Sequence, residues 1–416
     1  MNKFVIYGGK KLFGEVEIQG SKNAVLPLLA GAIITEEKVT IDNVPRLVDV
    51  DNMINILKSL GADVVFENKR VVVNPEGISS FSISASLAKE LRSSIFLLGA
   101  VLARKKRAIV AYPGGCDIGL RPIDIHIKAL KDLGVKIEET AGYIYCDANE
   151  MSGGEVYLDY PSVGATENVI LSSVLSNGMT IIYNSAREPE IVELQRFLNL
   201  CGARIIGAGT SKITIEGVSR LKGCSYRTMP DRIATGTYAI ATLMTGGEVA
   251  LKGAKIGDIN SIFSKIPKNS CNITQSNGII FIKAKGNPIS VDNVSTQPYP
   301  GFPTDLQAPF MALQTISRGT CVITENIFEN RFRHVPELKK MGADIIIKDR
   351  TAVIKGVPKL VGAEVYARDL RGGASLVLAG LSAEGTTIVN DTYHIDRGYE
   401  NIEKVFTRLG ANIIRI

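Results

Sequence analysis

The sequence predicts an α/β protein made of six copies of one unit, grouped as two domains of three copies each. Five stretches with helical spacing of apolar residues each end on a glycine, and two short strands around a polar turn follow it. The interval between the third and fourth of these glycines is about twice the others, which predicts one further copy near residue 270. The five glycines are Gly61, Gly134, Gly202, Gly342 and Gly410.

The first copy contains every part of the unit. Met53, Leu57 and Leu60 recur at helical spacing, and the glycine that follows can adopt the left-handed conformation that ends a helix. Strands are expected over residues 62–66 and 70–73, on either side of a polar turn. A helix, its glycine cap and a strand pair therefore define the repeat.

The copy near residue 270 is degenerate. Apolar residues from Ile259 to Ile266 keep the helical period, and Ser270 stands in place of the glycine. Strands are expected around Ile273 and over residues 279–282. Six copies then account for the chain.

Each copy also contains a second helix that is apolar on nearly all sides, which places it inside a domain. Several of these helices begin at a basic residue, such as Lys22 or Arg232. A cation there opposes the helix dipole unless an anion is bound, so the helix beginnings predict an anion site. Ser162 and Thr304 are expected to be ordinary helix caps. The six helices are expected over residues 24–34, 95–103, 169–175, 233–244, 308–316 and 374–381.

The domain boundary follows from the repeat count. Copies one to three occupy residues 22–229, and copies four to six occupy residues 230–416. Residues 1–21, with a strand over 4–7, are expected to join the second domain, so that two linkers connect the halves. A cleft between the two domains is where we expect the ligands.

Composition narrows the class of function. The 416 residues are 45% hydrophobic, and the net charge of +6 is spread without a lysine-arginine tract, which favours small acidic substrates over nucleic acid. Neither the cysteines nor the histidines have metal-ligand spacing, and the sequence lacks a signal peptide and a membrane-spanning run. We expect a soluble cytoplasmic protein without a metal site. The residues concerned are Cys116, Cys146, Cys201, Cys224, Cys271, Cys321, His126, His334 and His394.

A glycine-flanked thiol is the strongest candidate for chemistry. Cys116 lies among glycines in the segment 113–126, five residues before Arg121. Glycines free the backbone to move, and a nearby guanidinium lowers a thiol pKa below its reference value of about 8.5. This arrangement suits a mobile acid or nucleophile that faces an anion. An isolated cysteine would more often be a small buried hydrophobe.

Seven segments together form a specific pattern: Gly20-Ser21-Lys22-Asn23-Ala24, residues 113–126, Ser162-Val163-Gly164-Ala165-Thr166, Pro189-Glu190-Ile191, Phe302-Pro303-Thr304-Asp305, Glu329-Asn330-Arg331-Phe332 and His394-Ile395-Asp396-Arg397-Gly398-Tyr399. With these motifs the chain closely resembles the UDP-N-acetylglucosamine 1-carboxyvinyltransferase family over essentially its full length. The resemblance implies two inside-out α/β barrel domains, each with threefold internal symmetry. That fold agrees with the repeat count.

The resemblance implies transfer of the enolpyruvyl group of phosphoenolpyruvate to the 3-hydroxyl of UDP-N-acetylglucosamine, with release of phosphate, as the first committed step of peptidoglycan synthesis. It implies a monomer with no metal and no organic cofactor. Cys116 matches the family's proton donor, and its thiolate can add to phosphoenolpyruvate to give a phospholactoyl adduct. Asp305 matches the carboxylate that takes the hydroxyl proton, although the residues alone fit a capping aspartate equally well. Fosfomycin is expected to alkylate Cys116.

Phosphoenolpyruvate is strongly anionic, so its site should contain several cations. Lys22, Arg121 and Arg397 match family residues that bind its phosphate or carboxylate, and Arg331 and Arg371 are expected close by. A surface salt bridge remains the commoner explanation for any single arginine. The remaining substrate contacts are expected from Arg92, Pro122, Ile123, Asp124, Ile125, Ser162 and Val163 to the UDP moiety, and from Asn23 and Ile327 near the sugar.

Two other functions fit parts of the pattern. A shikimate-pathway enolpyruvyl transferase would share the architecture but lacks the loop cysteine, so Cys116 favours the nucleotide-sugar acceptor. A non-catalytic nucleotide-sugar sensor would keep the binding groups and lose the acid or the base, whereas both Cys116 and Asp305 are present. One departure from the family is Tyr160-Pro161, where some members carry a lysine, so part of the diphosphate contact is expected to differ.

Overall fold

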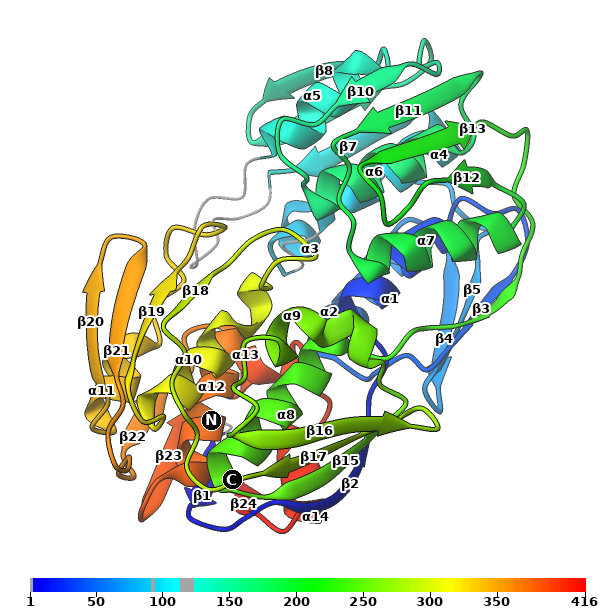
Figure 1. Cartoon of the computed structure of the whole chain (residues 1–416). Helices are drawn as coiled ribbons and strands as arrows, with labels where there is room; N and C mark the ends of the chain where they lie inside the picture. Colours follow the sequence, from blue (N-terminus) through cyan, green and yellow to red (C-terminus); the bar gives the residue numbers. More distant parts are fainter. Residues whose placement is uncertain (1–2, 91–93, 113–122) are drawn as a thin grey trace. The chain divides into compact units, whose positions relative to one another are not determined.

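The computed structural model describes residues 3–90, 94–112 and 123–416 (Figure 1). Arg92, Cys116, Arg121 and Pro122 lie outside the described residues. Within the described part, residues 20–229 form one compact unit, and residues 3–19 together with 230–416 form another. We call them the N-terminal unit and the C-terminal unit.

The N-terminal unit alternates helices with short strands. Its elements are α1 (Lys22–Ala32), β3 (Val39–Asp42), α2 (Val48–Ser59), β4 (Asp63–Glu67), β5 (Arg70–Asn74), β6 (Ser82–Ile83), α3 (Ala85–Glu90), η1 (Ser94–Phe96), α4 (Leu97–Lys105), β7 (Arg107–Ala111), α5 (Asp124–Asp132), β8 (Lys136–Thr140), β9 (Tyr143–Asp147), β10 (Glu155–Tyr157), α6 (Val163–Ser173), β11 (Met179–Tyr183), α7 (Pro189–Leu200), β12 (Arg204–Ile206), β13 (Lys212–Glu216) and β14 (Ser225–Arg227).

The C-terminal unit repeats this alternation and includes the first two strands of the chain. Its elements are β1 (Phe4–Tyr7), β2 (Phe13–Glu17), α8 (Arg232–Thr245), β15 (Glu248–Lys252), η2 (Ile256–Ile259), α9 (Asn260–Phe263), β16 (Cys271–Ser276), β17 (Ile279–Ala284), β18 (Asn293–Ser295), η3 (Thr304–Leu306), α10 (Gln307–Thr315), β19 (Thr320–Thr324), α11 (Val335–Lys340), β20 (Asp344–Lys348), β21 (Thr351–Lys355), β22 (Glu364–Tyr366), α12 (Leu370–Ser382), β23 (Thr386–Asn390), α13 (Tyr393–Asp396), α14 (Ile402–Arg408) and β24 (Asn412–Arg415).

The sixfold repeat is confirmed by the sheets. The described residues form six four-stranded sheets, three in each unit. Every sheet has one parallel pair at an edge and two antiparallel pairs, as in the order β6-β7-β9-β8. Most of the predicted strand pairs that follow a glycine cap, such as β4 with β5, are antiparallel neighbours. One unit of sequence therefore builds one sheet.

Strands from distant parts of the chain complete three of the sheets. The last copy has only β24 after its glycine, and β1 lies between β23 and β24, with Phe4 opposite Arg415. Strand β2 pairs with β15, also in the C-terminal unit. In the N-terminal unit, β14 pairs with β3 and returns the chain to its first sheet. These pairings tie the ends of each unit together.

Three apolar helices lie in the core of each unit. Helices α1, α4 and α6 contact one another in the N-terminal unit, as α8, α10 and α12 do in the C-terminal unit. Nearly every residue of these helices is buried, because they are apolar all round. Each unit has its own hydrophobic core. Helices inside and sheets outside make the inside-out arrangement that the family resemblance implies.

The five predicted glycine caps are confirmed by positive backbone φ angles between 85° and 105°. At Gly61, a β-carbon would lie 2.4 Å from the carbonyl oxygen of Gly77, so any residue with a side chain would clash at this cap of α2. The degenerate copy has the short helices η2 and α9 followed by β16 and β17. The five capping residues are Gly61, Gly134, Gly202, Gly342 and Gly410.

Two cysteines that the spacing did not connect lie side by side. The sulfur of Cys201, at the end of α7, is 3.3 Å from that of Cys224, just before β14, and both are free thiols. The reason is the return of the chain to its first sheet, where the Lys222 amide also donates to the Cys201 carbonyl at 2.8 Å. The 23-residue separation of the two cysteines in the sequence did not indicate this proximity.

Candidate active site

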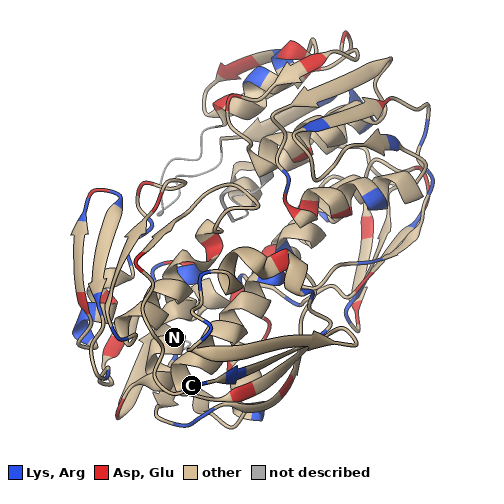
Figure 2. Ribbon diagram, viewed as in Figure 1, with Lys and Arg blue, Asp and Glu red and all other residues tan. Residues whose placement is uncertain are grey.

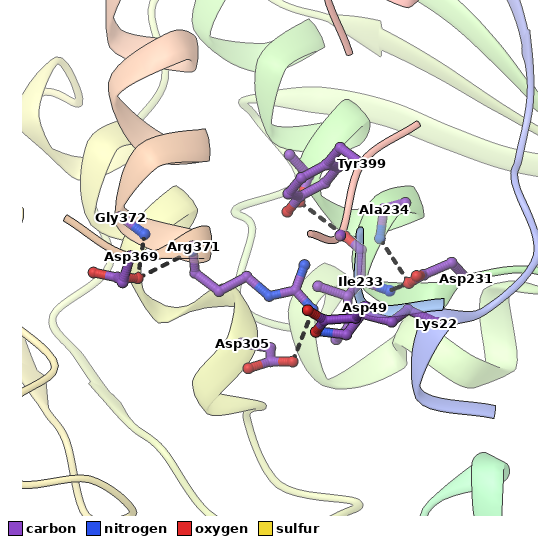
Figure 3. Close-up of polar contacts among 12 residues, drawn as sticks. Lys22, Asp49, Asp231, Ile233, Ala234, Asp305, Asp369, Arg371, Gly372 and Tyr399 are labelled. Atoms are coloured by element: carbon purple, nitrogen blue, oxygen red, sulfur yellow. Dashed lines mark hydrogen bonds and ion pairs between the residues drawn. The ribbon is translucent and has the colours of Figure 1, made fainter. Parts of the chain in front are cut away.

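Asp305 binds two buried arginines in the C-terminal unit. It lies in η3, at the entrance to α10. Its Oδ2 accepts a hydrogen bond from Arg371 Nη2 at 2.9 Å (Figure 3). Its Oδ1 accepts one from Arg331 Nη2 at 2.8 Å. The arginine side chains are 4% exposed, whereas that of Asp305 is 26% exposed. The carboxylate is therefore the accessible member of the group, and the two guanidinium groups favour its ionised form.

Arg371 is positioned by the beginning of α12. Asp369 caps this helix, because its Oδ1 accepts hydrogen bonds from the backbone amides of Arg371 and Gly372 at 3.0 and 2.9 Å (Figure 3). The guanidinium lies 5.5 Å from the ring centre of Tyr399. Burial is the largest single effect and acts to lower the pKa of Arg371, but Asp305, Tyr399 and Asp231 together outweigh it, so that the net pKa is raised. Arg371 thus remains a cation in a buried position.

Glu325 organises the loops around Asp305, and sequence reasoning missed it. Its side chain is fully buried. Its Oε2 accepts a hydrogen bond from Thr304 at 2.9 Å, and its Oε1 accepts bonds from Thr296 and from the backbone amide of Ile327, both at 2.9 Å. The prediction that Thr304 caps a helix was therefore wrong, because its hydroxyl donates to this carboxylate. A carboxylate that follows a buried strand was the available signal.

Gln307 is a second residue that the sequence analysis did not identify. It begins α10, two residues after Asp305, and it is fully buried. Neither atom of its side-chain amide has a hydrogen-bond partner in the described ranges. A polar side chain within an apolar helix was the signal for it.

Arg397 follows α13, and it is half-buried. The preceding residue, Asp396, accepts two hydrogen bonds from Arg415, at 2.6 and 2.8 Å. Gln19 holds the next turn, since its amide donates to the Gly398 carbonyl at 3.0 Å and accepts from the Glu400 amide at 2.9 Å. The backbone that carries Arg397 is thus fixed on both sides.

In the N-terminal unit, Lys22 is the first residue of α1. Its Nζ lies 2.6 Å from Asp49 Oδ2, and the two side chains are 12% and 2% exposed (Figure 3). The sequence argument required a bound anion to balance a cation at this helix beginning. The structure provides an internal carboxylate from α2 instead, which stabilises the cation where the helix dipole does not. Asn23, the next residue, is half-buried.

The described residues expected to bind the UDP moiety lie at the beginnings of α5 and α6, two helices in contact. Ser162 caps α6 as predicted, since its Oγ accepts from the Ala165 amide at 3.3 Å. Val163 is the first residue of α6, and Asp124 is the first of α5. The exposure of this set varies: Ile123 is buried, Ile125, Ser162 and Val163 are half-buried, and Asp124 is exposed.

Charges of both signs are interspersed over the described residues of each unit (Figure 2). In the described ranges, no group of three or more histidine, cysteine, aspartate or glutamate side chains could hold a metal ion. No helix in these ranges combines the length and the apolar character needed to cross a bilayer.

Comparison with known proteins identifies the family. Residues 6–406 match the model of the EPSP synthase (3-phosphoshikimate 1-carboxyvinyltransferase) family. The chain is 51% identical over 416 residues to UDP-N-acetylglucosamine 1-carboxyvinyltransferase 2 of Caldanaerobacter subterraneus subsp. tengcongensis, with all of both chains covered. It is 47% identical to UDP-N-acetylglucosamine 1-carboxyvinyltransferase of Nitratidesulfovibrio vulgaris, covering 100% of this chain and 99% of the relative. The chain belongs to the UDP-N-acetylglucosamine 1-carboxyvinyltransferase family.

Solved structures share the fold of this family at low sequence identity. The enolpyruvyl transferase NikO from Streptomyces tendae has a TM-score of 0.89 and 22% identity, over 100% of this chain and 98% of that one. EPSP synthase from Acinetobacter baumannii has a TM-score of 0.74 and 18% identity over the whole of both chains. These likenesses confirm the predicted enolpyruvyl transferase fold.

Proposed function

We propose that this chain transfers the enolpyruvyl group of phosphoenolpyruvate to the 3-hydroxyl of UDP-N-acetylglucosamine, releasing phosphate, as the first committed step of peptidoglycan synthesis. The observation that carries the proposal is full-length identity of 44–51% to relatives named for this transfer. Asp305, which accepts hydrogen bonds from Arg331 and Arg371, provides a carboxylate suited to take the proton of the sugar hydroxyl. We also propose that the protein acts as a cytoplasmic monomer.

The reaction needs an acid and a base. In the proposed first step, Cys116 gives a proton to the methylene carbon of phosphoenolpyruvate, and the sugar oxygen forms a bond to the adjacent carbon while its proton passes to Asp305. In the second step, the Cys116 thiolate takes a proton back from the new methyl group while the carbon–oxygen bond to phosphate breaks, which restores the alkene and the thiol. Asp305 passes its proton to the departing phosphate. Accessibility supports the role of Asp305, since its carboxylate is more exposed than the arginines that hold it.

Several cations would hold the substrates. We assign Lys22, Arg121 and Arg397 to the phosphate and carboxylate of phosphoenolpyruvate, with Arg331 and Arg371 stabilising the charge on Asp305. For Arg331 and Arg371 the support is their direct bond to the carboxylate. We assign the UDP moiety to Arg92, Pro122, Ile123, Asp124, Ile125, Ser162 and Val163, and the sugar to Asn23 and Ile327.

A phosphate-release assay with two acceptors tests the proposal. Purified protein and phosphoenolpyruvate should release phosphate with UDP-N-acetylglucosamine and not with shikimate 3-phosphate. Release with shikimate 3-phosphate alone would favour 3-phosphoshikimate 1-carboxyvinyltransferase activity, for which the matched family model is named. Absence of release with both acceptors, with retained nucleotide-sugar binding, would favour the sensor.

A further inference from the structure

A pair of thiols joins the end of α7 to the return segment, which we define as residues 221–229. The sulfur of Cys201 lies 3.3 Å from that of Cys224, and both thiols are free. Cys201 is buried, with 1% of its surface exposed, whereas Cys224 is half-buried. A reagent in solution therefore meets Cys224 before it meets Cys201.

Backbone hydrogen bonds hold both cysteines in place. The Lys222 amide donates to the Cys201 carbonyl at 2.8 Å, and the Thr40 amide donates to the Cys224 carbonyl at 2.8 Å. A disulfide holds its sulfurs about 2 Å apart, so small rotations of the two side chains would bring these atoms within bonding distance. The fold thus prepares the pair for a covalent bond without a rearrangement of the main chain.

One face of α7 follows the return segment over three successive turns. Next to the thiol pair, the ring of Phe197 packs edge-on against that of Tyr226, with the ring centres 5.6 Å apart. One turn further, Glu193 Oε1 accepts a hydrogen bond from the Met229 amide at 2.7 Å. The C-terminal unit begins at residue 230. A bond between the thiols would therefore fasten the segment through which the chain leaves the N-terminal unit.

The two thiols differ in reactivity as well as in exposure. The hydrogen bond from the Cys201 thiol lowers the pKa of Cys224 more than burial raises it. The contact with Cys224 and burial both raise the pKa of Cys201. Since the thiolate is the nucleophile in thiol–disulfide exchange, Cys224 is the attacking thiol and Cys201 the resolving one.

We propose that Cys201 and Cys224 form a modification site, at which a low-molecular-weight disulfide converts the two thiols into an intramolecular disulfide that fastens the return segment to α7. None of the candidate site residues belongs to this pair, so the inference does not depend on the proposed function.

The exchange proceeds in two balanced steps. The Cys224 thiolate first attacks one sulfur of the reagent, which forms a mixed disulfide and releases one thiolate that takes up the proton lost by Cys224. The Cys201 sulfur then attacks the Cys224 sulfur and gives its proton to the second departing thiolate. The two protein thiols are oxidised, and the reagent disulfide is reduced to two thiols.

Glutathione disulfide and peptide mass spectrometry test the site on the native protein. After exchange, alkylation of the remaining thiols and digestion with trypsin, peptides 197–204 and 223–227 should appear as one species, two hydrogens lighter than their sum and without glutathione. Dithiothreitol should separate them. The same treatment in urea should give at least about tenfold less of this species, because the unfolded chain does not hold the thiols together. A lasting glutathione adduct on Cys224, a bond between two molecules or no reaction at either thiol would overturn the proposal.

Two serine variants separate the pair from the other buried cysteines. In Cys224→Ser, the species should be absent and Cys201 should stay unmodified, because it is almost fully buried. Cys271→Ser is the matched control, since Cys271 is also buried and free, and it should leave the yield within about twofold of native. Cross-linking of Cys201 to another cysteine in Cys224→Ser would contradict the assignment.

Hydrogen exchange tests whether the new bond fastens the return segment. Oxidation of the native protein should slow exchange in β14 and in the last turn of α7 by about tenfold or more, since a cross-link restricts local opening. The same treatment of Cys224→Ser should leave exchange in both elements unchanged. Equal or faster exchange in the oxidised native protein would show that the disulfide does not fasten this segment.

Discussion

At the scale of residues, chemistry depends on charges that the surrounding protein keeps in one state. Asp305 remains ionised because two buried guanidinium groups donate to it. The same bonds reduce its basicity, so we expect it to take the hydroxyl proton only as the oxygen bonds to carbon. The charge of Lys22 is balanced in a similar way, by the carboxylate of Asp49 within the protein.

Asp305→Asn should lower turnover by about 10²- to 10⁴-fold while nucleotide-sugar binding is largely retained, since the amide cannot accept the hydroxyl proton. A phosphate-release assay would measure turnover, and an equilibrium binding assay would measure affinity for the nucleotide sugar. Glu248→Gln is the control, because it also breaks an acid-base pair in the C-terminal unit, between Glu248 and Lys283 on the surface. Turnover of Asp305→Asn close to native would exclude it as the base.

Cys116→Ser should abolish turnover near neutral pH and retain nucleotide-sugar binding, because a hydroxyl is a far weaker acid than a thiol. Fosfomycin should add once, at Cys116, as peptide mass spectrometry can determine. Burial raises the pKa of Cys146 and of Cys321 to about 12, so these thiols stay protonated and inert. An adduct on either of them instead would contradict the assigned role.

At the scale of elements, the site is built from helix beginnings and from the loops that precede them. Asp369 caps α12 and thereby places Arg371, while Ser162 caps α6. Glu325 has a different role, because it connects the loop of Ile327 to η3, where Asp305 lies. Side chains that hold backbone in this way determine the positions of reacting groups without touching the substrate.

Glu325→Ala should lower the free energy of unfolding by about 3 kcal/mol and reduce turnover, because it leaves two hydroxyls and backbone amides without their acceptor. Urea unfolding and phosphate release would measure both. Glu329→Ala removes an exposed carboxylate that pairs with Arg350, and it should change stability little. Equal effects of the two substitutions would show that Glu325 does not organise the site.

His334, at the beginning of α11, should make stability depend on pH. Burial lowers its pKa to about 4, with the charge of Asp369 opposing and that of Arg331 adding to this effect. The unfolded chain then binds the extra proton first, so the free energy of unfolding should fall by up to about 3 kcal/mol as pH drops from 6.5 to about 4. His334→Gln should reduce this slope in urea unfolding, and His394→Gln should not. A slope unchanged by His334→Gln would refute the assignment.

At the scale of the whole molecule, two hydrophobic cores are built by the same repeated unit. Phe197 lies in the core of the N-terminal unit and Phe406 in that of the C-terminal unit, both fully buried. Because each unit has its own core, we expect each to open as a separate cooperative region.

Phe197→Ala should destabilise the N-terminal unit by about 3–5 kcal/mol and leave the other core protected. Phe406→Ala is its counterpart, and it should act on the C-terminal unit alone. Hydrogen exchange followed by mass spectrometry would locate the effect of each substitution. Faster exchange throughout the chain from either substitution would mean that the units open together.

Local patterns were enough to predict the repeat, the glycine caps and the buried helices, because helical period and backbone conformation depend on neighbouring residues. The family resemblance, rather than local pattern, identified Asp305, Arg331 and Arg371, which the structure brings together. Thr304 shows the limit, since its hydroxyl reaches a carboxylate 21 residues away rather than its own helix.

Tertiary structure alone decided which distant groups balance one another. Asp49 pairs with Lys22, Asn168 contacts the ring of His126, and the thiol of Cys224 reaches that of Cys201, each through the packing of separate elements. The physical reason is that burial makes an unbalanced polar group costly, while the partner that satisfies it is chosen by proximity in space. Sequence spacing carries no record of that proximity.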